Sequence, residues 1–145
     1  MKSPPRFVCN YALLRYLPYP ERGEFVNVGI VVHCAEVGWC GYEEDDCDAV
    51  RVTQFFPAVK AEDYVSQKRA MIMELDRVRN LIQGTADKKL ARSIFLELVR
   101  PRESLLRFGE LRTAMTDDPA ALVVQLCDLY VRQKLPVSIS ASAQV

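Results

Sequence analysis

The segment 23–34, GEFVNVGIVVHC, constrains the fold more than any other part of the chain. Its even positions are apolar without interruption from Val26 to Cys34. Because successive side chains of a strand point to opposite faces, this alternation predicts a β-strand with one face in the core. The odd positions include Asn27 and His33, which we expect to project together from the other face, roughly 20 Å apart along the strand.

Further strands are expected on either side of this segment. Residues 6–17 are rich in aromatic and branched side chains and end at Pro18, and a turn at residues 36–38 leads to the short strand 39–42. Two alternating segments joined by short connections predict an antiparallel sheet that begins with an N-terminal hairpin. The alternation in 49–56 predicts another strand, and segments 105–108 and 111–116 predict a hairpin or one irregular strand.

Three segments have the apolar spacing of amphipathic helices. These are residues 62–82, 87–99 and 118–134, the last beginning at Asp118-Pro119, a favourable helix start. The sequence therefore predicts an α+β fold in which an antiparallel sheet packs against three helices, with at least one sheet face fully covered. We expect one domain over residues 1–134 and a loose tail over 135–145.

Charge and cysteine content limit the function. The chain has 145 residues with 19 basic and 19 acidic side chains, which removes the sequence-wide argument for binding nucleic acid. Its five cysteines, an odd number and widely spread, are typical of a reducing compartment. The apolar stretch 7–14 is interrupted by Asn10 and lacks a signal-peptide cleavage site, and no stretch approaches the roughly 18 apolar residues of a membrane span. We expect a cytoplasmic protein that does not contact membranes.

The charges are distributed unevenly along the chain. Acidic side chains concentrate in residues 43–48, whereas basic ones lie on the helical segments after Arg51. The plain interpretation is a solvated loop facing a solvated helix surface. The alternative is that the opposed charges orient a partner protein.

Polar residues near the first two strands form the first candidate site: Arg15, Glu24, Asn27 and His33. In a hydrolase, His33 could serve as general base with Glu24 as its partner, while Arg15 binds an anionic substrate. Against this, Asn27 and His33 lie far apart along one strand. The competing interpretation is that both are half-buried side chains whose hydrogen bonds are satisfied by neighbours.

A metal site and an anion site are the other candidates. His33, Cys34, Cys40 and Cys47 are zinc-ligand types within 15 residues, but there is no CxxC pair, and adjacent strand residues point to opposite faces. Buried free thiols are the simpler expectation, and we predict no cofactor. The basic cluster near Asp117 and Asp118 could bind an anionic ligand or an acidic partner, or could pair locally. It comprises Arg100, Arg102, Arg107 and Arg112.

Several short segments of the sequence resemble those of a bacterial protein family of unknown function, DUF3037. They are YALLRYLPYPER followed by GEFVNVGIVV (11–32), FFP (55–57), PRESLLRF (101–108) and RTAMTDDP (112–119). The polar positions that match the family are Arg15, Arg22, Glu24, Asn27, Arg102, Thr116 and Asp118. The resemblance implies a small cytoplasmic bacterial protein, associated with genes for HipA-like kinases, and it carries no established catalytic residues.

Three functional hypotheses follow. The chain has no Gly-rich phosphate loop, GxSxG elbow, HExxH motif or paired-carboxylate signature, which favours a non-catalytic interaction or regulatory module, in line with a HipA-like kinase partner. One alternative is a small hydrolase or nuclease-like enzyme that uses either the Arg15, Glu24, Asn27 and His33 set or the region of Arg102 and Arg112. The other is a zinc-stabilised binding domain. The oligomeric state does not follow from the sequence.

Overall fold

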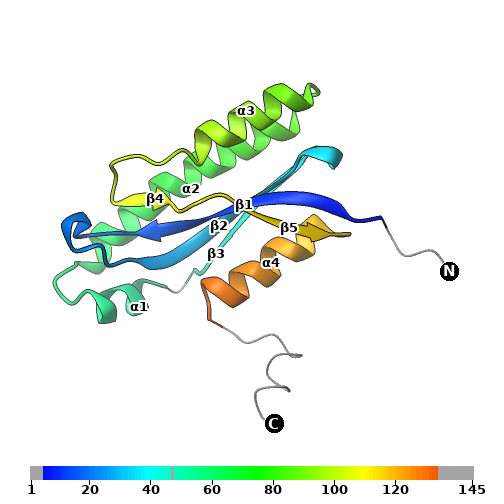
Figure 1. Cartoon of the computed structure of the whole chain (residues 1–145). Coiled ribbons are helices and arrows are strands. Elements are labelled where there is room, and N and C mark those ends of the chain that lie inside the picture. The colour runs from blue at the N-terminus through cyan, green and yellow to red at the C-terminus, as the bar shows by residue number, and fades with distance from the viewer. Residues whose placement is uncertain (1–4, 47, 134–145) are drawn as a thin grey trace, which may run out of the picture.

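A computed structural model describes residues 5–46 and 48–133, and its centre is a five-stranded antiparallel sheet (Figure 1). Its strands are β1 (Phe7–Tyr16), β2 (Val26–Cys34), β3 (Trp39–Glu44), β4 (Leu106–Phe108) and β5 (Arg112–Thr116). The order across the sheet is β3-β2-β1-β4, and β5 also pairs with β1. The α+β class and the N-terminal hairpin predicted from the sequence are confirmed.

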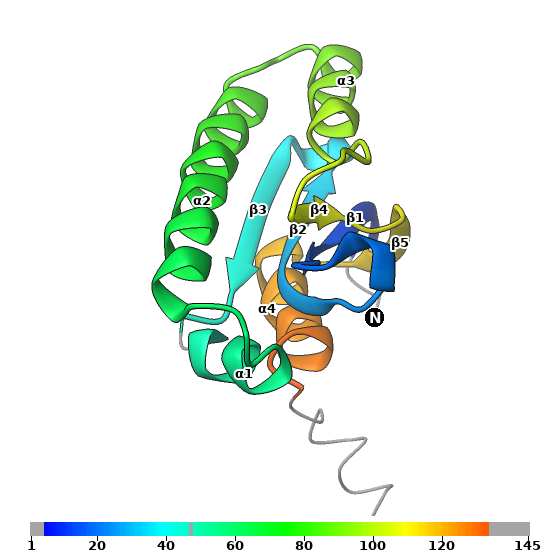
Figure 2. The same ribbon diagram turned by 90° about the vertical axis from the view of Figure 1, so that its left-hand side faces the viewer.

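Helices cover both faces of the sheet. The three expected from the spacing of apolar residues are α2 (Ala61–Gln83), α3 (Lys88–Leu98) and α4 (Pro119–Tyr130). Figures 1 and 2 show α2 and α3 on one face and α4 on the other. The start of α4 is as predicted, because the Asp118 carboxylate accepts a hydrogen bond from the Ala121 amide at 3.2 Å.

The strand predicted over 49–56 is wrong, since residues 49–55 belong to the helix α1 (Asp48–Phe55) and Phe56 directly follows it. The same residues also fit a helical spacing, in which Val52 and Phe56 are buried and Val50 and Phe55 are exposed. Alternation and helical spacing cannot be told apart over so few residues. The helix places Val52 and Phe56 in the core beside Tyr16 and Tyr64, and this burial outweighs the strand preference of the β-branched side chains.

The segments 105–108 and 111–116 form one interrupted strand and no hairpin. Both β4 and β5 pair antiparallel with β1, β4 beside Leu14 to Tyr16 and β5 beside Phe7 to Tyr11. Gly109 lies between them, where a side chain would place its Cβ 2.6 Å from Cζ of Arg15. The strand is interrupted at the point where the Arg15 side chain crosses the backbone.

A β-bulge corrects the expectation that one side of β2 is apolar throughout. Leu14 pairs with Gly29 but Arg15 pairs with Asn27, so Val28 is an extra residue in β2. The extra residue reverses the alternation: Val26 and Val28 pack toward α2, whereas Ile30, Val32 and Cys34 pack toward α4. Asn27 and His33 therefore lie on opposite faces and not on the same one.

The sheet separates two hydrophobic cores. The larger core joins β1 and β2 to α1, α2 and α3 around Tyr64, Phe95 and Leu14. The smaller core joins the other face to α4 around Cys127 and Val131. Over residues 5–46 and 48–133, no helix is long and apolar enough to cross a membrane. The tail predicted over 135–145 lies outside the described residues.

Candidate functional site

The first candidate set is divided by the fold. Arg15 and Asn27 lie opposite each other on β1 and β2, on the face that α4 covers. Nδ2 of Asn27 donates to the Tyr130 carbonyl at 3.3 Å, and the Arg15 guanidinium lies 4.3 Å from the centre of the Phe25 ring. Nε of Arg15 and Oδ1 of Asn27 are buried without a partner among the described residues.

Glu24 and His33 lie apart from that pair. The Glu24 carboxylate is exposed and pairs with Arg22 at 2.8 Å. The His33 ring is 1% exposed on the opposite face, 5.0 Å from the Phe95 ring of α3, and neither ring nitrogen has a hydrogen bond among the described residues. Burial and the nearby Arg92 charge lower the pKa of His33. In this structure the four residues form no shared cleft.

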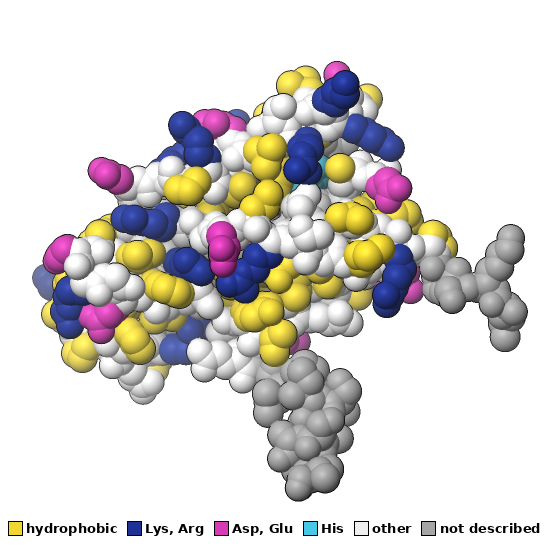
Figure 3. Space-filling view, in the orientation of Figure 1, with side chains coloured by type: hydrophobic (Ala, Val, Ile, Leu, Met, Phe, Trp, Pro, Cys, Tyr) yellow, Lys and Arg dark blue, Asp and Glu magenta, His cyan; other side chains and the backbone are white. Residues whose placement is uncertain are grey.

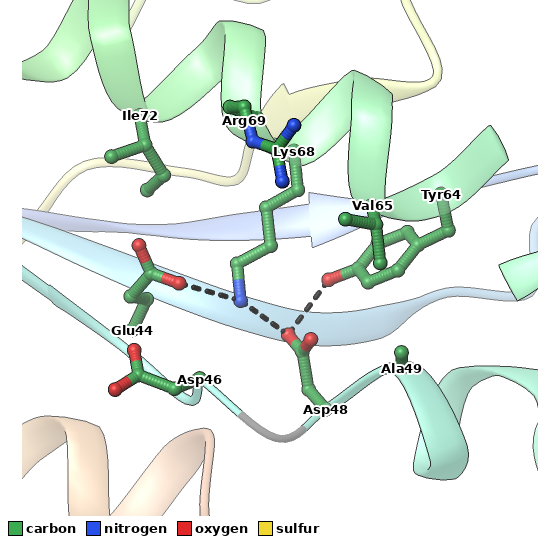
Figure 4. Close-up of a pocket in the computed structure, with 9 residues that line it drawn as sticks. All are labelled: Glu44, Asp46, Asp48, Ala49, Tyr64, Val65, Lys68, Arg69 and Ile72. Atoms are coloured by element: carbon green, nitrogen blue, oxygen red, sulfur yellow. Dashed lines mark hydrogen bonds and ion pairs between the residues drawn. The ribbon is translucent and has the colours of Figure 1, made fainter. Parts of the chain in front are cut away.

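A buried ion-pair cluster joins the end of β3 to the starts of α1 and α2 (Figure 4). Lys68 is 6% exposed, and its ammonium group lies 2.8 Å from a carboxylate oxygen of Glu44, 2.8 Å from Oδ2 of Asp48, and 2.7 Å from the Asp45 carbonyl. The Tyr64 hydroxyl donates to the same Asp48 oxygen at 2.7 Å. Burial and this hydrogen bond raise the pKa of Tyr64 well above its usual range.

The ion-pair cluster lines a hollow of about 220 Å³. Its contacts hold the end of β3 and the start of α1 against α2, which is a structural role. An ammonium group has three N–H donors, and each of the three from Lys68 has an acceptor. All three donors of Lys68 are therefore engaged by acceptors of the chain itself. The cluster, with Arg132 bound to Glu43 and to the Glu44 carbonyl, neutralises much of the acidic segment 43–48 within the chain.

A long hollow surface lies along α2, between α3 and the segment 100–108; we call it the helix groove. Hollows of about 460, 120 and 450 Å³ share lining residues, so they form one groove from Leu81 to Gln67 of α2. At 1.5 Å per residue, that length is about 21 Å. Its apolar lining residues are Ala70, Met71, Val78, Leu81, Ile94, Leu98, Leu105, Leu106 and Phe108.

Charged residues border the helix groove, and basic side chains outnumber acidic ones. The basic ones are Arg77, Arg100, Arg102 and Arg107, against Glu74 and Glu97. Arg77 and Arg102 pair with Glu74 and Glu97, and the hydrogen bond from Arg77 lowers the pKa of Glu74. In the space-filling view, hydrophobic side chains lie among basic and acidic ones over α2 and α3 (Figure 3).

The basic cluster predicted from the sequence is divided too. Arg102 and Arg107 belong to the helix groove, where Arg102 also donates to the Glu97 carbonyl at 2.9 Å and Arg107 to the Ser104 carbonyl at 2.9 Å. Arg112 lies on β5, 5.8 Å from the Tyr130 ring and 3.5 Å from the Glu110 carboxylate. Asp118 serves to start α4.

Comparison with protein families decides the identity of the chain. Residues 11–131 match the model of a family described as protein of unknown function, DUF3037. The match covers every helix and every strand of the structure except the first four residues of β1. The chain belongs to this family. No curated protein and no solved structure gives a match. The DUF3037 match includes the PRESLLRF segment, which lines the helix groove.

The residues considered as zinc ligands in the DUF3037 chain do not lie together at one place in the fold. His33 and Cys40 face α2 and α3, whereas Cys34 faces α4, and Cys47 lies outside the described residues. Within residues 5–46 and 48–133, no three His, Cys, Asp or Glu side chains are grouped to bind one metal ion. Cys9, Cys34, Cys40 and Cys127 are buried free thiols. Burial raises the pKa of Cys40 to about 12.

Two features of the DUF3037 chain were not predicted from its sequence. Lys68 occupies the apolar stripe of α2, four residues after Tyr64 and seven before Leu75, and a lysine at such a position signals a buried partner. The helix groove gives no such local signal. It arises from α2, α3 and the segment 100–108, which are separate in sequence and meet only in the fold.

Proposed function

We propose that this DUF3037 chain is a non-catalytic protein-binding module of the bacterial cytoplasm whose helix groove receives an amphipathic helix. The observation that carries the proposal is the series of apolar side chains along the groove, about 21 Å long, with charged side chains among them. A helix of about four turns has this length, and its apolar stripe at spacing i, i+3, i+4, i+7 matches such a series.

The charge of the rim specifies the chemistry of the bound helix. Four arginines against two glutamates leave a basic excess along the groove. We infer that the partner helix carries acidic residues beside its apolar stripe, since complementary charge speeds association and excludes wrong partners. The resemblance makes a HipA-like kinase the first partner to test.

A matched pair of leucine variants tests this proposal. Leu81 lies in the groove and is 47% exposed, whereas Leu90 of α3 is 53% exposed outside the residues that line it. Leu81→Glu adds an acidic group where an acidic partner binds, so we expect at least a tenfold loss of affinity for the purified kinase. Leu90→Glu should bind as the unchanged protein does, and binding should weaken between about 0.1 M and about 0.5 M salt.

If that kinase does not bind, photo-crosslinking identifies the partner. A photoreactive residue replaces Ile94 in the groove or, as the control, Met115 on the exposed side of β5. We expect one host protein to crosslink through position 94 only, by a segment with helical apolar spacing and acidic flanks. A partner whose affinity is unchanged by Leu81→Glu would overturn the proposal, and so would turnover of a nucleotide or phosphoester by the pure protein.

A further inference from the structure

The open edge of the sheet at β3 carries a second surface, on the other flank of α2. The Cys40 amide donates to Oε1 of Gln83 at 3.3 Å, and the Glu44 carbonyl accepts from Nη2 of Arg132 at 2.6 Å. Both backbone groups therefore point away from β2. Because backbone groups in an antiparallel strand alternate in direction, the amide and carbonyl of Tyr42, midway between these residues, also point outward.

A groove of about 410 Å³ runs along this edge; we call it the edge groove. One wall is polar and comes from Arg79, Asn80 and Gln83 of α2. The other is mostly apolar and is formed by Ala120, Val123 and Val124 of α4 together with Trp39. Figure 2 shows β3 between α2 and α4. The Trp39 indole lies against Gly41, where a side chain would clash with it.

We propose that the edge groove binds one extended segment of a partner protein as an additional antiparallel strand. The Tyr42 amide and carbonyl would form the central pair of hydrogen bonds, as in other peptides that extend a sheet. Side chains of the added strand alternate between the two walls, so the segment must alternate apolar residues toward Val124 with polar residues toward Asn80.

The shape of the groove favours a single strand over a second copy of this chain. An added strand lies about 4.8 Å from its neighbour and fits between walls that stand on both sides of the strand edge. A second copy would bring its own α2 and α4 against those walls. Gln83 and Arg132 occupy outward groups at the two ends of β3, which limits pairing to a short segment and blocks continued sheet growth.

Selection of peptides from a displayed library of random sequences, about ten residues long, tests the proposal. We expect the selected peptides to alternate apolar and polar residues and to lose at least tenfold in affinity on Val124→Glu, which changes a side chain that is 42% exposed on the apolar wall. Leu90→Glu is the matched control. Saturation with a selected peptide should slow hydrogen exchange of the Tyr42 amide at least tenfold.

A second pair of variants tests the backbone pairing directly. Tyr42→Pro removes the outward amide, which an edge strand tolerates, and should abolish peptide binding. Tyr42→Phe keeps the amide and loses only the hydrogen bond from the hydroxyl to Asp76, so it should bind normally. If Tyr42→Pro does not fold, hydrogen exchange of the Tyr42 amide in the unchanged protein, with and without bound peptide, still tests whether the peptide pairs with β3.

Three outcomes would overturn this inference. The first is that no peptide is selected, or that the selected peptides have helical spacing and respond to Leu81→Glu and not to Val124→Glu. The second is unchanged exchange of the Tyr42 amide in the bound state. The third is concentration-dependent dimerisation that Val124→Glu abolishes, which would assign the edge to a second copy. Helical spacing with a response to Leu81→Glu would support the helix groove while overturning the edge groove. The second and third outcomes do not involve the helix groove, so the two proposals fail separately.

Discussion

Lys68 illustrates how one residue can fix the relation between elements. Its ammonium group binds acceptors from the end of β3 and from the start of α1 while its backbone belongs to α2. Burying an ammonium group is costly unless its charge and all its donors are matched. The position of the acidic segment over α2 therefore depends on this side chain.

We predict that Lys68→Met destabilises the protein by about 3–5 kcal/mol, because it leaves the Asp48 carboxylate buried without its cation. The double variant Lys68→Met, Asp48→Leu should regain part of that loss, since the uncompensated charge is then absent. Urea unfolding of both variants measures the difference. Arg77→Ala, which breaks an exposed pair with Glu74, is the control and should leave the free energy of unfolding almost unchanged. A cost for Lys68→Met as small as the control would contradict the prediction.

His33 is the single histidine of the chain, and its burial predicts how stability changes with pH. Its pKa in the folded protein is lowered from 6.5, so the unfolded chain takes up a proton first as the pH falls. The stability should be full above 6.5 and should fall as the pH drops below that value toward the folded pKa. Carboxyl groups titrate mostly near pH 4, outside this window.

Urea unfolding between about pH 7.5 and about pH 5.5 measures this loss. The His33→Leu variant keeps an apolar contact with Phe95 and should have a flatter pH dependence over the same range, whatever its absolute stability. Equal pH slopes for the variant and the unchanged protein would show that another group is responsible.

At the scale of elements, α1 and the bulge in β2 show tertiary contacts overriding local pattern. Residues 49–56 alternate as a strand does, yet they form a helix because Val52 and Phe56 reach the core that way. The extra residue Val28 moves the apolar side of β2 from one core to the other. Both cases depend on what lies beyond the segment itself.

The helical state of α1 predicts opposite effects of one substitution in two elements. Val50 is exposed on α1, and Val50→Ala should stabilise the protein by about 0.5 kcal/mol because alanine favours helix. Val8 is exposed on β1, and Val8→Ala should destabilise it because alanine is a poor strand former. Denaturation midpoints compare the two. A loss of stability for Val50→Ala would argue for a strand at that position.

The whole molecule is a sheet between two cores that share β1 and β2. Cys9, Cys34 and Cys127 lie in the core under α4, and Cys40 lies in the core under α2. Because the shared strands contribute side chains to both cores, we expect the two to unfold together.

Thiol labelling tests this cooperativity. Burial raises the pKa of Cys9 and of Cys40 to about 12 and that of Cys127 to about 11, so the buried thiols should resist a disulfide reagent at about pH 8 in the native state. In a Cys47→Ser background, Cys40 and Cys127 should become labelled at equal rates in mild denaturant, as mass spectrometry of the fragments would show. Faster labelling of Cys127 would mean that α4 opens independently.

The sequence by itself determined the features that depend on neighbours along the chain. The N-terminal hairpin, the apolar stripe of α2 and the start of α4 at Asp118 each follow from spacing and from the chemistry of one or two residues. Only the tertiary structure decided the helix at α1, the opposite faces of Asn27 and His33, the acceptors around Lys68, and the two grooves beside α2. These features depend on contacts between distant segments, where the burial gained in the assembled fold exceeds the small differences in local preference.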